Sequence, residues 1–358
     1  MLKKILLHAL LYLLGLFGGA QAIAALGLGF TSYRPGAFYT PDGIAVPIAE
    51  IANFLTGGGY LGGGEGEHPR GRLVAGLRVK QGYDRPRWDY FDAQGCILIE
   101  HNSLGFRDEE FPIQKPAGEF RVLALGDSFT WGSGVRAEDA WPQVLERGLA
   151  AGGRKAQVIN CGFAAGSYSP AGYDTWMVSD GLLLQPDLVV VGFCLNDMGN
   201  DNDVPMLSYQ GVTTVGCPVA LVDQFLTYFE NRRLMASPVD FAAVVEKRPE
   251  TWNATQQALR NLQRILAEKK VPLVVAVIPM VSQLDQVPGP YDALHRMVGA
   301  FCAEAGIPCV DLKNVLAGRH DADLWVHPTD QHPNHLGQKL LGQGVLRYLV
   351  EKGLDGPQ

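Results

Sequence analysis

Two polar segments, far apart in the chain, carry the residue types that nucleophilic catalysis needs. Ser128 comes three residues after the apolar run 122–125, and Asp330 and His332 lie near the C-terminal end. A serine hydroxyl becomes a useful nucleophile when a neighbouring base takes its proton, and an imidazole oriented by a carboxylate can do this. The residue types therefore predict a hydrolase with Ser128 as nucleophile, His332 as general base and Asp330 as orienting acid.

These residues also have non-catalytic interpretations. Asp127 and Asp197 are expected to be structural, because Asp favours helix caps and turns. His327, Asp330, His332 and His335 form an alternative set of metal ligands, but their spacing matches no common zinc pattern, and two prolines interrupt any single helical face. We therefore expect no metal and no other cofactor.

Elements that position these residues follow one another as alternating strands and helices from residue 121 onward. Apolar runs predict buried strands, and amphipathic runs between them predict helices. The predicted strands are 122–125, 156–159, 187–193, 271–278 and 308–311, and the predicted helices are 138–151, 251–269, 291–305 and 333–352. This alternation predicts a mostly parallel five-stranded sheet with helices on both faces. Residues 218–250 are expected to form a helical insertion.

Polar residues follow the first three predicted strands. Ser128 comes after the first strand, Asn160 after the second, and Asn196 with Asp197 after the third. Carboxyl ends of parallel strands meet at one edge of a sheet, which is where α/β folds bind ligands. These residues are therefore expected to lie close together, and a loop entering the last helix can bring Asp330 and His332 to the same edge.

Four segments in this order resemble the SGNH hydrolases, also called the GDSL esterase and lipase family. They are Gly126-Asp127-Ser128, Asn160-Cys161-Gly162 through Gly166, Gly192 through Asn196-Asp197, and Asp330-Gln331-His332-Pro333-Asn334 with Gly337. The segment 102–107 and Arg121 look like a lead-in of membrane-anchored bacterial members. The G-x-S-x-G elbow of the rival α/β-hydrolase fold does not occur in the sequence.

The resemblance implies a flavodoxin-like three-layer α/β/α sandwich, the SGNH hydrolase fold. It also implies an oxyanion hole built from the backbone N–H of Ser128, a backbone N–H of Gly166 and the side-chain amide of Asn196. Gly162 is the alternative glycine, because the usual spacing from Asn160 falls on Ala165, one residue before Gly166.

The N-terminal residues 1–31 are expected to direct the chain to the cell envelope. Lys3 and Lys4 precede an apolar stretch, residues 5–30, that is long enough to span a bilayer as a helix. Ala20-Gln21-Ala22 leaves a cleaved signal peptide as the alternative. Both interpretations place the remainder outside the cytoplasm, and the uncleaved form predicts an anchor in the inner membrane.

Residues 32–118 are expected to form an extracytoplasmic lead-in before a hydrolase domain over 119–358. They contain a glycine-rich linker over 57–64 and a predicted hairpin of 88–91 with 96–99. Cys302 and Cys309 would be able to pair in an oxidising compartment. The net charge of −7, without a basic stripe, argues against nucleic-acid binding.

The expected function is hydrolysis of esters through an acyl-serine intermediate. The expected substrates are O-acyl groups, such as acetyl, on an envelope or extracellular polysaccharide, or lipid esters. An O-acetyltransferase with the same triad is the alternative within this chemistry. A non-catalytic carbohydrate-binding or assembly protein is the alternative from another class.

Overall fold

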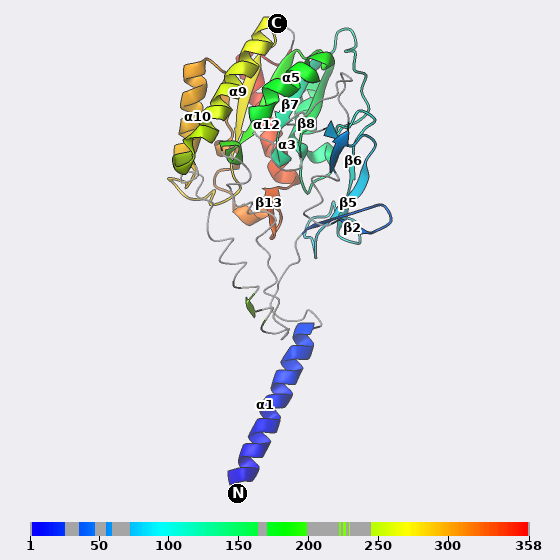
Figure 1. Ribbon diagram of the computed structural model, residues 1–358, viewed down its shortest axis with the longest axis vertical. Coiled ribbons are helices and arrows are strands. Elements are labelled where there is room, and N and C mark those ends of the chain that lie inside the picture. Colours follow the sequence, from blue (N-terminus) through cyan, green and yellow to red (C-terminus); the bar gives the residue numbers. More distant parts are fainter. Residues whose placement is uncertain are drawn as a thin grey trace.

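A parallel sheet forms the centre of the computed structural model, which describes residues 2–25, 36–46, 55–58, 72–163, 170–198, 222, 225–226, 229 and 245–356 (Figure 1). Its strands are β7 (Phe120–Gly126), β8 (Ala156–Gly162), β9 (Leu188–Cys194), β10 (Leu273–Ile278) and β11 (Cys309–Asp311). Their spatial order is β11-β10-β9-β7-β8, the 2-1-3-4-5 order of flavodoxin-like sheets. The predicted fold class is confirmed.

Helices cover both faces of this sheet, as Figure 1 shows. Val122 and Ala124 of β7 share an apolar cluster with α4 (Trp141–Ala151) and α12 (His335–Lys352). Leu123 and Leu125 belong to a second cluster with α5 (Tyr173–Ser179), α9 (Pro249–Glu268) and α10 (Asp292–Ala305). Since strand side chains alternate between faces, an unbroken apolar run suits a strand that is covered on both sides.

The predicted helices form, with shifted starts. The helix predicted from residue 138 opens as the 3-10 turn η1 (Ala137–Asp139) before α4. The last helix begins at His335, because Asn334 caps it by accepting the N–H groups of Leu336 and Gly337 at 3.0 and 3.1 Å. Short elements that we did not predict include α3 (Ser128–Trp131), α11 (Lys313–Leu316), β12 (Trp325–His327), β13 (Asp330–Pro333) and the 3-10 turns η2 (Pro170–Gly172), η3 (Gly181–Leu184), η4 (Leu195–Met198) and η5 (Asp321–Asp323).

A small antiparallel sheet lies N-terminal to the parallel one. Its order is β2-β1-β5-β6, from β1 (Ala37–Tyr39), β2 (Ala45–Val46), β5 (Arg78–Gly82) and β6 (Cys96–Glu100). The hairpin prediction is half wrong, because β6 pairs with β5 and not with residues 88–91. Those residues form turns, in which the Trp88 indole N–H donates to the Trp325 carbonyl at 2.8 Å.

The glycine-rich stretch is described only at its start, where β3 (Thr56–Gly58) pairs with β4 (Arg72–Leu73). Residues 59–71 lie outside the described residues, as does most of the predicted insertion 218–250. Cys302 and Cys309 are free thiols.

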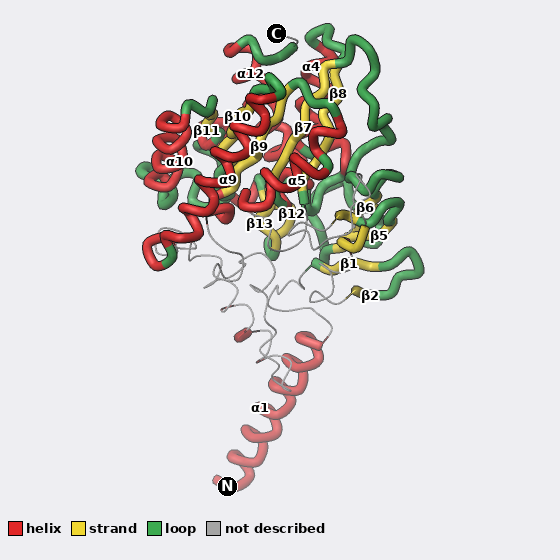
Figure 2. Tube along the Cα trace, turned by 45° about the horizontal axis from the view of Figure 1, so that its top comes forward, coloured by secondary structure: helices red, strands yellow, loops and turns green. Residues whose placement is uncertain are grey.

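The small sheet shares its core with the parallel sheet. Phe38, Val79, Ile97 and Ile99 belong to the same apolar cluster as Leu123 of β7. Figure 2 shows this sheet and the β12–β13 hairpin at the same end of the body. The lead-in is therefore packed against the part of the fold that carries the predicted site.

The N-terminal residues form the helix α1 (Leu2–Ala25), whose large apolar side chains from Leu7 to Phe17 are exposed. In the described part of the chain, we find no helix with the length and apolar character that a membrane crossing requires. Residues 26–30 of the predicted membrane-spanning stretch 5–30 lie outside the described residues.

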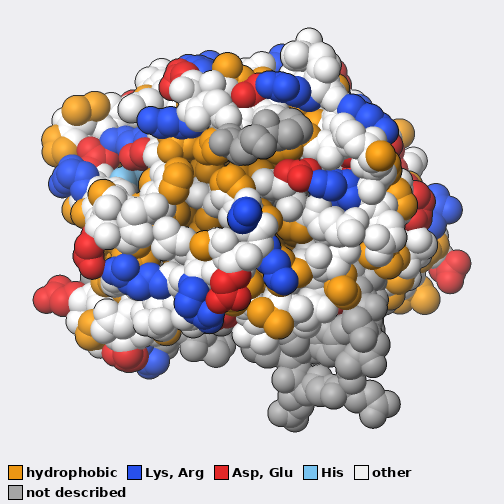
Figure 3. Space-filling model, turned by 90° about the horizontal axis from the view of Figure 1, so that it is seen from above, with side chains coloured by type: hydrophobic (Ala, Val, Ile, Leu, Met, Phe, Trp, Pro, Cys, Tyr) orange, Lys and Arg blue, Asp and Glu red, His pale blue; other side chains and the backbone are white. Residues whose placement is uncertain are grey.

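The surface at the end opposite α1 is drawn in Figure 3. On this face Lys and Arg side chains are interspersed with Asp and Glu side chains. The net negative charge of the chain is therefore not gathered into one acidic patch there.

Candidate active site

Three glycines stand side by side at the carboxyl edge of the sheet. Gly126 of β7 is aligned with Gly162 of β8 and with Gly192 of β9. A Cβ on Gly126 would meet the Thr130 hydroxyl oxygen at 2.0 Å, and one on Gly162 would meet the Trp131 nitrogen at 2.2 Å. The glycines thus let α3, which contains Thr130 and Trp131, lie directly on the ends of the strands.

Ser128 is the first residue of α3. Asp127 caps this helix, since its Oδ1 accepts the N–H of Phe129 at 2.9 Å. The chain leaves α3 through Gly132, which has the left-handed backbone that glycine adopts at little cost. The structural role expected for Asp127 is confirmed.

The hairpin β12–β13 brings the acid and the base to Ser128. Asp330 and His332 both lie on β13, two residues apart, so that their side chains share one face of the strand. The His332 backbone N–H donates to Asp330 Oδ1 at 3.0 Å and fixes the spacing between them. This hairpin had no clear signal in the sequence, because each strand is only a few residues long.

The three predicted catalytic residues form one hydrogen-bonded chain. Ser128 Oγ lies 2.8 Å from His332 Nε2, and His332 Nδ1 lies 2.5 Å from Asp330 Oδ1. The carboxylate only accepts, so the proton of the neutral imidazole sits on Nδ1. This leaves Nε2 to accept the proton of the serine hydroxyl. The arrangement is able to transfer a proton from Ser128 to His332.

Burial and charge shift the acid and the base in opposite directions. Burial alone lowers the pKa of His332, but the charge of Asp330 and its hydrogen bond outweigh burial, so the pKa is raised above 6.5. Burial alone raises the pKa of Asp330, but His332, Tyr83 and the backbone N–H hold it below 3.8. Asp330 is therefore ionised over the pH range in which His332 accepts a proton.

Asn196, in η4 directly after β9, lies beside α3. Its Nδ2 donates to Asp127 Oδ2 at 2.8 Å, which places the amide next to the residue preceding Ser128. An amide nitrogen carries two N–H donors, and the second has no partner within the described residues, so it is able to donate to a ligand. Asp197, by contrast, accepts the Cys194 N–H at 3.0 Å through Oδ2, consistent with the structural role expected for it.

The oxyanion glycine is not placed by the structure. Gly166 lies outside the described residues. The N–H of the alternative, Gly162, already donates to Asn160 Oδ1 at 2.9 Å, so this donor is occupied. Asn160 itself is buried beneath α3, where it holds the end of β8.

The histidines of the alternative metal set have other partners. His327 Nε2 lies 2.8 Å from the Asp84 carbonyl oxygen, and its Nδ1 lies 2.8 Å from the Thr329 hydroxyl. His335 packs edge-on against the rings of Trp88 and Tyr90. Within the described residues, no three His, Cys, Asp or Glu side chains are grouped so as to hold a metal ion.

Residues of the lead-in also reach this site. The sequence analysis singled out the segment 102–107 but gave neither Tyr83 nor Arg107 a role in the site. Tyr83, just after β5, donates its hydroxyl proton to Asp330 Oδ2 at 2.5 Å. Arg107 is fully buried and donates to the carbonyl oxygen of Trp131 at the end of α3 and to those of Gly132 and Val135 in the loop that follows. Burial lowers the pKa of Arg107 to about 9. Both contacts join positions that are distant in the sequence, and no local pattern announces them.

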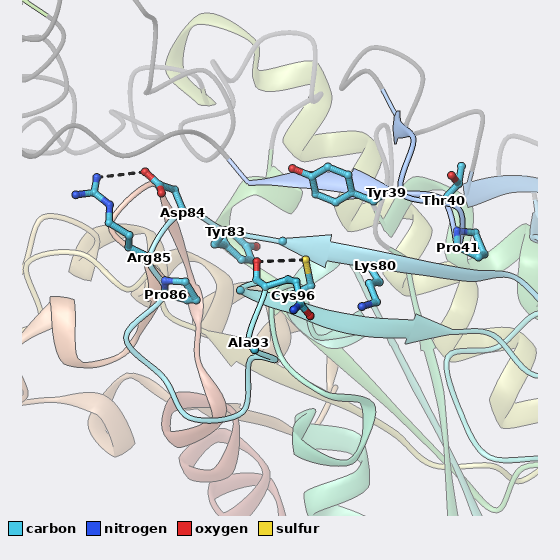
Figure 4. Close-up of a pocket in the computed structure, with 14 residues that line it drawn as sticks. Tyr39, Thr40, Pro41, Lys80, Tyr83, Asp84, Arg85, Pro86, Ala93 and Cys96 are labelled. Carbon is cyan, nitrogen blue, oxygen red and sulfur yellow. Dashed lines mark hydrogen bonds and ion pairs between the residues drawn. The ribbon is translucent and has the colours of Figure 1, made fainter. Parts of the chain in front are cut away.

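A cavity of about 670 Å³ adjoins Tyr83 (Figure 4). Tyr39, Asp84 and Arg85 line it together with Tyr83. Tyr83 therefore lines this cavity, and its hydroxyl bonds the carboxylate of Asp330.

Comparison with solved structures finds GDSL proteins and esterases. A lipolytic protein of the G-D-S-L family from Desulfitobacterium hafniense DCB-2 is 19% identical, with a TM-score of 0.41 over 64% of this chain and 99% of that one. An acetylxylan esterase from Geobacillus stearothermophilus, solved as a catalytic mutant, is 16% identical and has a TM-score of 0.41. The match covers 64% of this chain and 94% of that one. A two-domain esterase active on acetylated mannans is 17% identical and has a TM-score of 0.42. The match covers 68% of this chain and 52% of that one.

Among curated proteins, none matches this chain. The family model of the GDSL-like lipases and acylhydrolases matches residues 124–340, more than half of the 358 residues. The matched segment contains Ser128, Asn196, Asp330 and His332, together with the three aligned glycines at the edge of the sheet. The chain therefore belongs to the GDSL-like lipase/acylhydrolase family and is a hydrolase of ester bonds.

Proposed function

We propose that this protein hydrolyses esters through an acyl-serine intermediate on Ser128. The observation that carries the proposal is the unbroken chain of hydrogen bonds from Ser128 through His332 to Asp330. His332 takes the hydroxyl proton as Ser128 attacks the ester carbonyl, then gives it to the leaving alcohol. Water next attacks the acyl-serine with His332 again as base, which releases the acid and restores Ser128.

The oxyanion of each tetrahedral intermediate needs donors that are already aimed at it. We assign this role to the backbone N–H of Ser128, to the second N–H of the Asn196 amide and to the backbone N–H of Gly166. Support comes from the bond between Asn196 and Asp127, which fixes the amide one residue away from the nucleophile.

The proposed substrates are O-acyl groups, acetyl above all, on an envelope or extracellular polysaccharide, with lipid esters as the second class. Family membership supports the ester bond, and the expected location of the chain supports a polysaccharide. Acetate release from an acetylated polysaccharide would favour the first class. Faster turnover of p-nitrophenyl esters with long acyl chains would favour the second.

Covalent labelling tests the nucleophile directly. We expect a fluorophosphonate probe to add one phosphonyl group to the full-length protein, and peptide mass spectrometry to locate the group on Ser128. The Ser128→Ala variant is the control and should remain unlabelled. Labelling of a different residue, or equal labelling of both proteins, would refute the assignment.

The raised pKa of His332 predicts how activity depends on pH. His332 acts as a base only when neutral, so kcat/KM should rise with pH through the pKa of the free enzyme. Because Asp330 raises that pKa, the midpoint of the acid limb should lie above 6.5. The check is kcat/KM for p-nitrophenyl acetate from about pH 5 to pH 9. A midpoint at or below 6.5 would contradict the ion pair.

The proposed location is outside the cytoplasm, at the cell envelope. What supports it is the apolar run that follows Lys3 and Lys4. Alkaline phosphatase fused after residue 31 should be active in cells that express the fusion, since that enzyme needs an oxidising compartment for its disulfides. An inactive fusion of normal abundance would place the domain inside the cell.

A further inference from the structure

We propose that Tyr83 is a positioning residue of the catalytic acid, so that the small N-terminal sheet supplies a fourth member of the hydrogen-bonded chain that ends at Ser128. The inference rests on the proposed function, because it assigns Asp330 its role in orienting His332. It gives Tyr83, for which the sequence indicated no role, an indirect part in catalysis through Asp330.

The direction of each proton in this chain follows from the backbone. The N–H of Gly134 donates to Gln81 Oε1 at 3.0 Å, and a backbone N–H is only a donor. The Gln81 amide must therefore turn its nitrogen toward Tyr83, where Nε2 lies 2.7 Å from the hydroxyl oxygen. The single proton of the Tyr83 hydroxyl is thus left to point at Asp330 Oδ2.

Asp330 receives donors on both of its oxygens. Oδ1 accepts the Nδ1 proton and the backbone N–H of His332, and Oδ2 accepts the hydroxyl of Tyr83. A carboxylate bonded at one oxygen alone retains freedom to rotate about its side-chain bond. The bond from Tyr83 to Oδ2 removes this freedom and keeps Oδ1 within hydrogen-bond distance of His332 Nδ1.

The surroundings of Tyr83 make it a rigid donor. Its side chain is buried with Val135 and Val326, and its ring contacts Phe91 and His327 at centroid distances of 5.6 and 5.2 Å. Charged and titratable groups near the acid and the base are Asp127, Tyr83, Tyr90 and His327. Of these, Tyr83 is the one whose bond reaches the carboxylate from the small sheet.

The Tyr83→Phe variant tests this role, because it removes the hydroxyl and keeps the packed ring. A hydrogen bond to a charged group is lost, so we expect kcat to fall about 10- to 100-fold with KM nearly unchanged. The acid limb of kcat/KM should also move to higher pH. Without the donor, Asp330 holds its charge on Oδ1 and binds the imidazolium proton more tightly.

The matched control is Tyr90→Phe. The Tyr90 hydroxyl is buried beside the same ring cluster and has no hydrogen-bond partner within the described residues. This variant should retain the kcat, the pH profile and the melting temperature of the unchanged protein. Tyr83→Phe leaves Gln81 Nε2 and Asp330 Oδ2 without their partner, so it should melt at a lower temperature but remain folded under the assay conditions. Equal losses in the two variants without a pH shift, or no change in Tyr83→Phe, would overturn the inference.

A proton NMR measurement on the protein without substrate tests the role of Tyr83 independently of the proposed function. The Nδ1 proton of His332 should give a downfield proton resonance in the NMR spectrum, and Tyr83→Phe should shift it. If turnover by the unchanged protein does not depend on Ser128, the proposed function fails, and the resonance still decides the role of Tyr83. A resonance that Tyr83→Phe leaves in place overturns the inference alone.

Discussion

Replacement of Ser128 by alanine is expected to lower kcat for p-nitrophenyl acetate by about 10⁶-fold, with the remaining turnover due to binding and the oxyanion donors. The variant lacks the oxygen that attacks the carbonyl, and His332 then has no hydroxyl proton to accept. The measurement is the initial rate of p-nitrophenolate release over a range of ester concentrations, which gives kcat and KM separately.

Two further variants make this result specific. Ser103→Ala removes an exposed hydroxyl that bonds Glu110 at 2.6 Å and should leave kcat unchanged. His332→Ala added to Ser128→Ala should cost nothing more, because residues that act as a unit lose their effect together. A rate that survives in Ser128→Ala would mean that another residue is the nucleophile.

Replacement of Asp330 by asparagine is expected to lower kcat by about 10³- to 10⁴-fold. An amide has one acceptor, whereas the native carboxylate accepts on both oxygens. With its nitrogen toward His332, the amide meets a donor and favours the wrong imidazole tautomer. With its nitrogen toward Tyr83, it faces a hydroxyl oxygen that already accepts from Gln81. Steady-state kinetics over pH is the measurement, and loss of the raised His332 pKa should accompany the loss of rate.

A double-mutant cycle sharpens this prediction. Phenylalanine at position 83 has no hydroxyl to face the amide nitrogen that Asp330→Asn introduces. The loss of kcat caused by Asp330→Asn should therefore be smaller in the Tyr83→Phe protein than in the unchanged protein. Additive losses would show that Tyr83 and Asp330 act independently. Melting temperatures of the four proteins serve as the control for folding.

The sequence predicted the parallel sheet and the proximity of Ser128, Asp330 and His332, because the strands and the short motifs that carry these residues leave strong local signals. Strands such as β7 are buried on both faces and therefore appear as unbroken apolar runs. Ser128, Asp330 and His332 stand in short motifs, and the structure brings these three together. The catalytic role of each, like that of Asn196 and Gly166, stays a prediction.

The parts that the sequence did not predict depend on contacts between distant segments. The strand β5 contains the polar residues Lys80 and Gln81, which interrupt the apolar pattern that would indicate a strand. Gln81 is nevertheless buried, and it bonds the N–H of Gly134. The turns at 88–91 contain aromatic residues that favour strands but are used to pack on His335. Neither feature is visible before the partner segment is in place.

The buried guanidinium of Arg107 has a consequence for how the chain unfolds. It lies 4.4 Å over the Trp131 ring and supplies donors to three carbonyl groups at the end of α3 and in the loop after it. Each carbonyl left without a donor would cost about 1–3 kcal/mol. Residues before position 124, where the family match begins, thus belong to the cooperative unit that carries the nucleophile. The segment that unfolds cooperatively is therefore longer than the segment that matches the family. A fragment that began at residue 124 would lack Arg107 and its hydrogen bonds to the loop after α3.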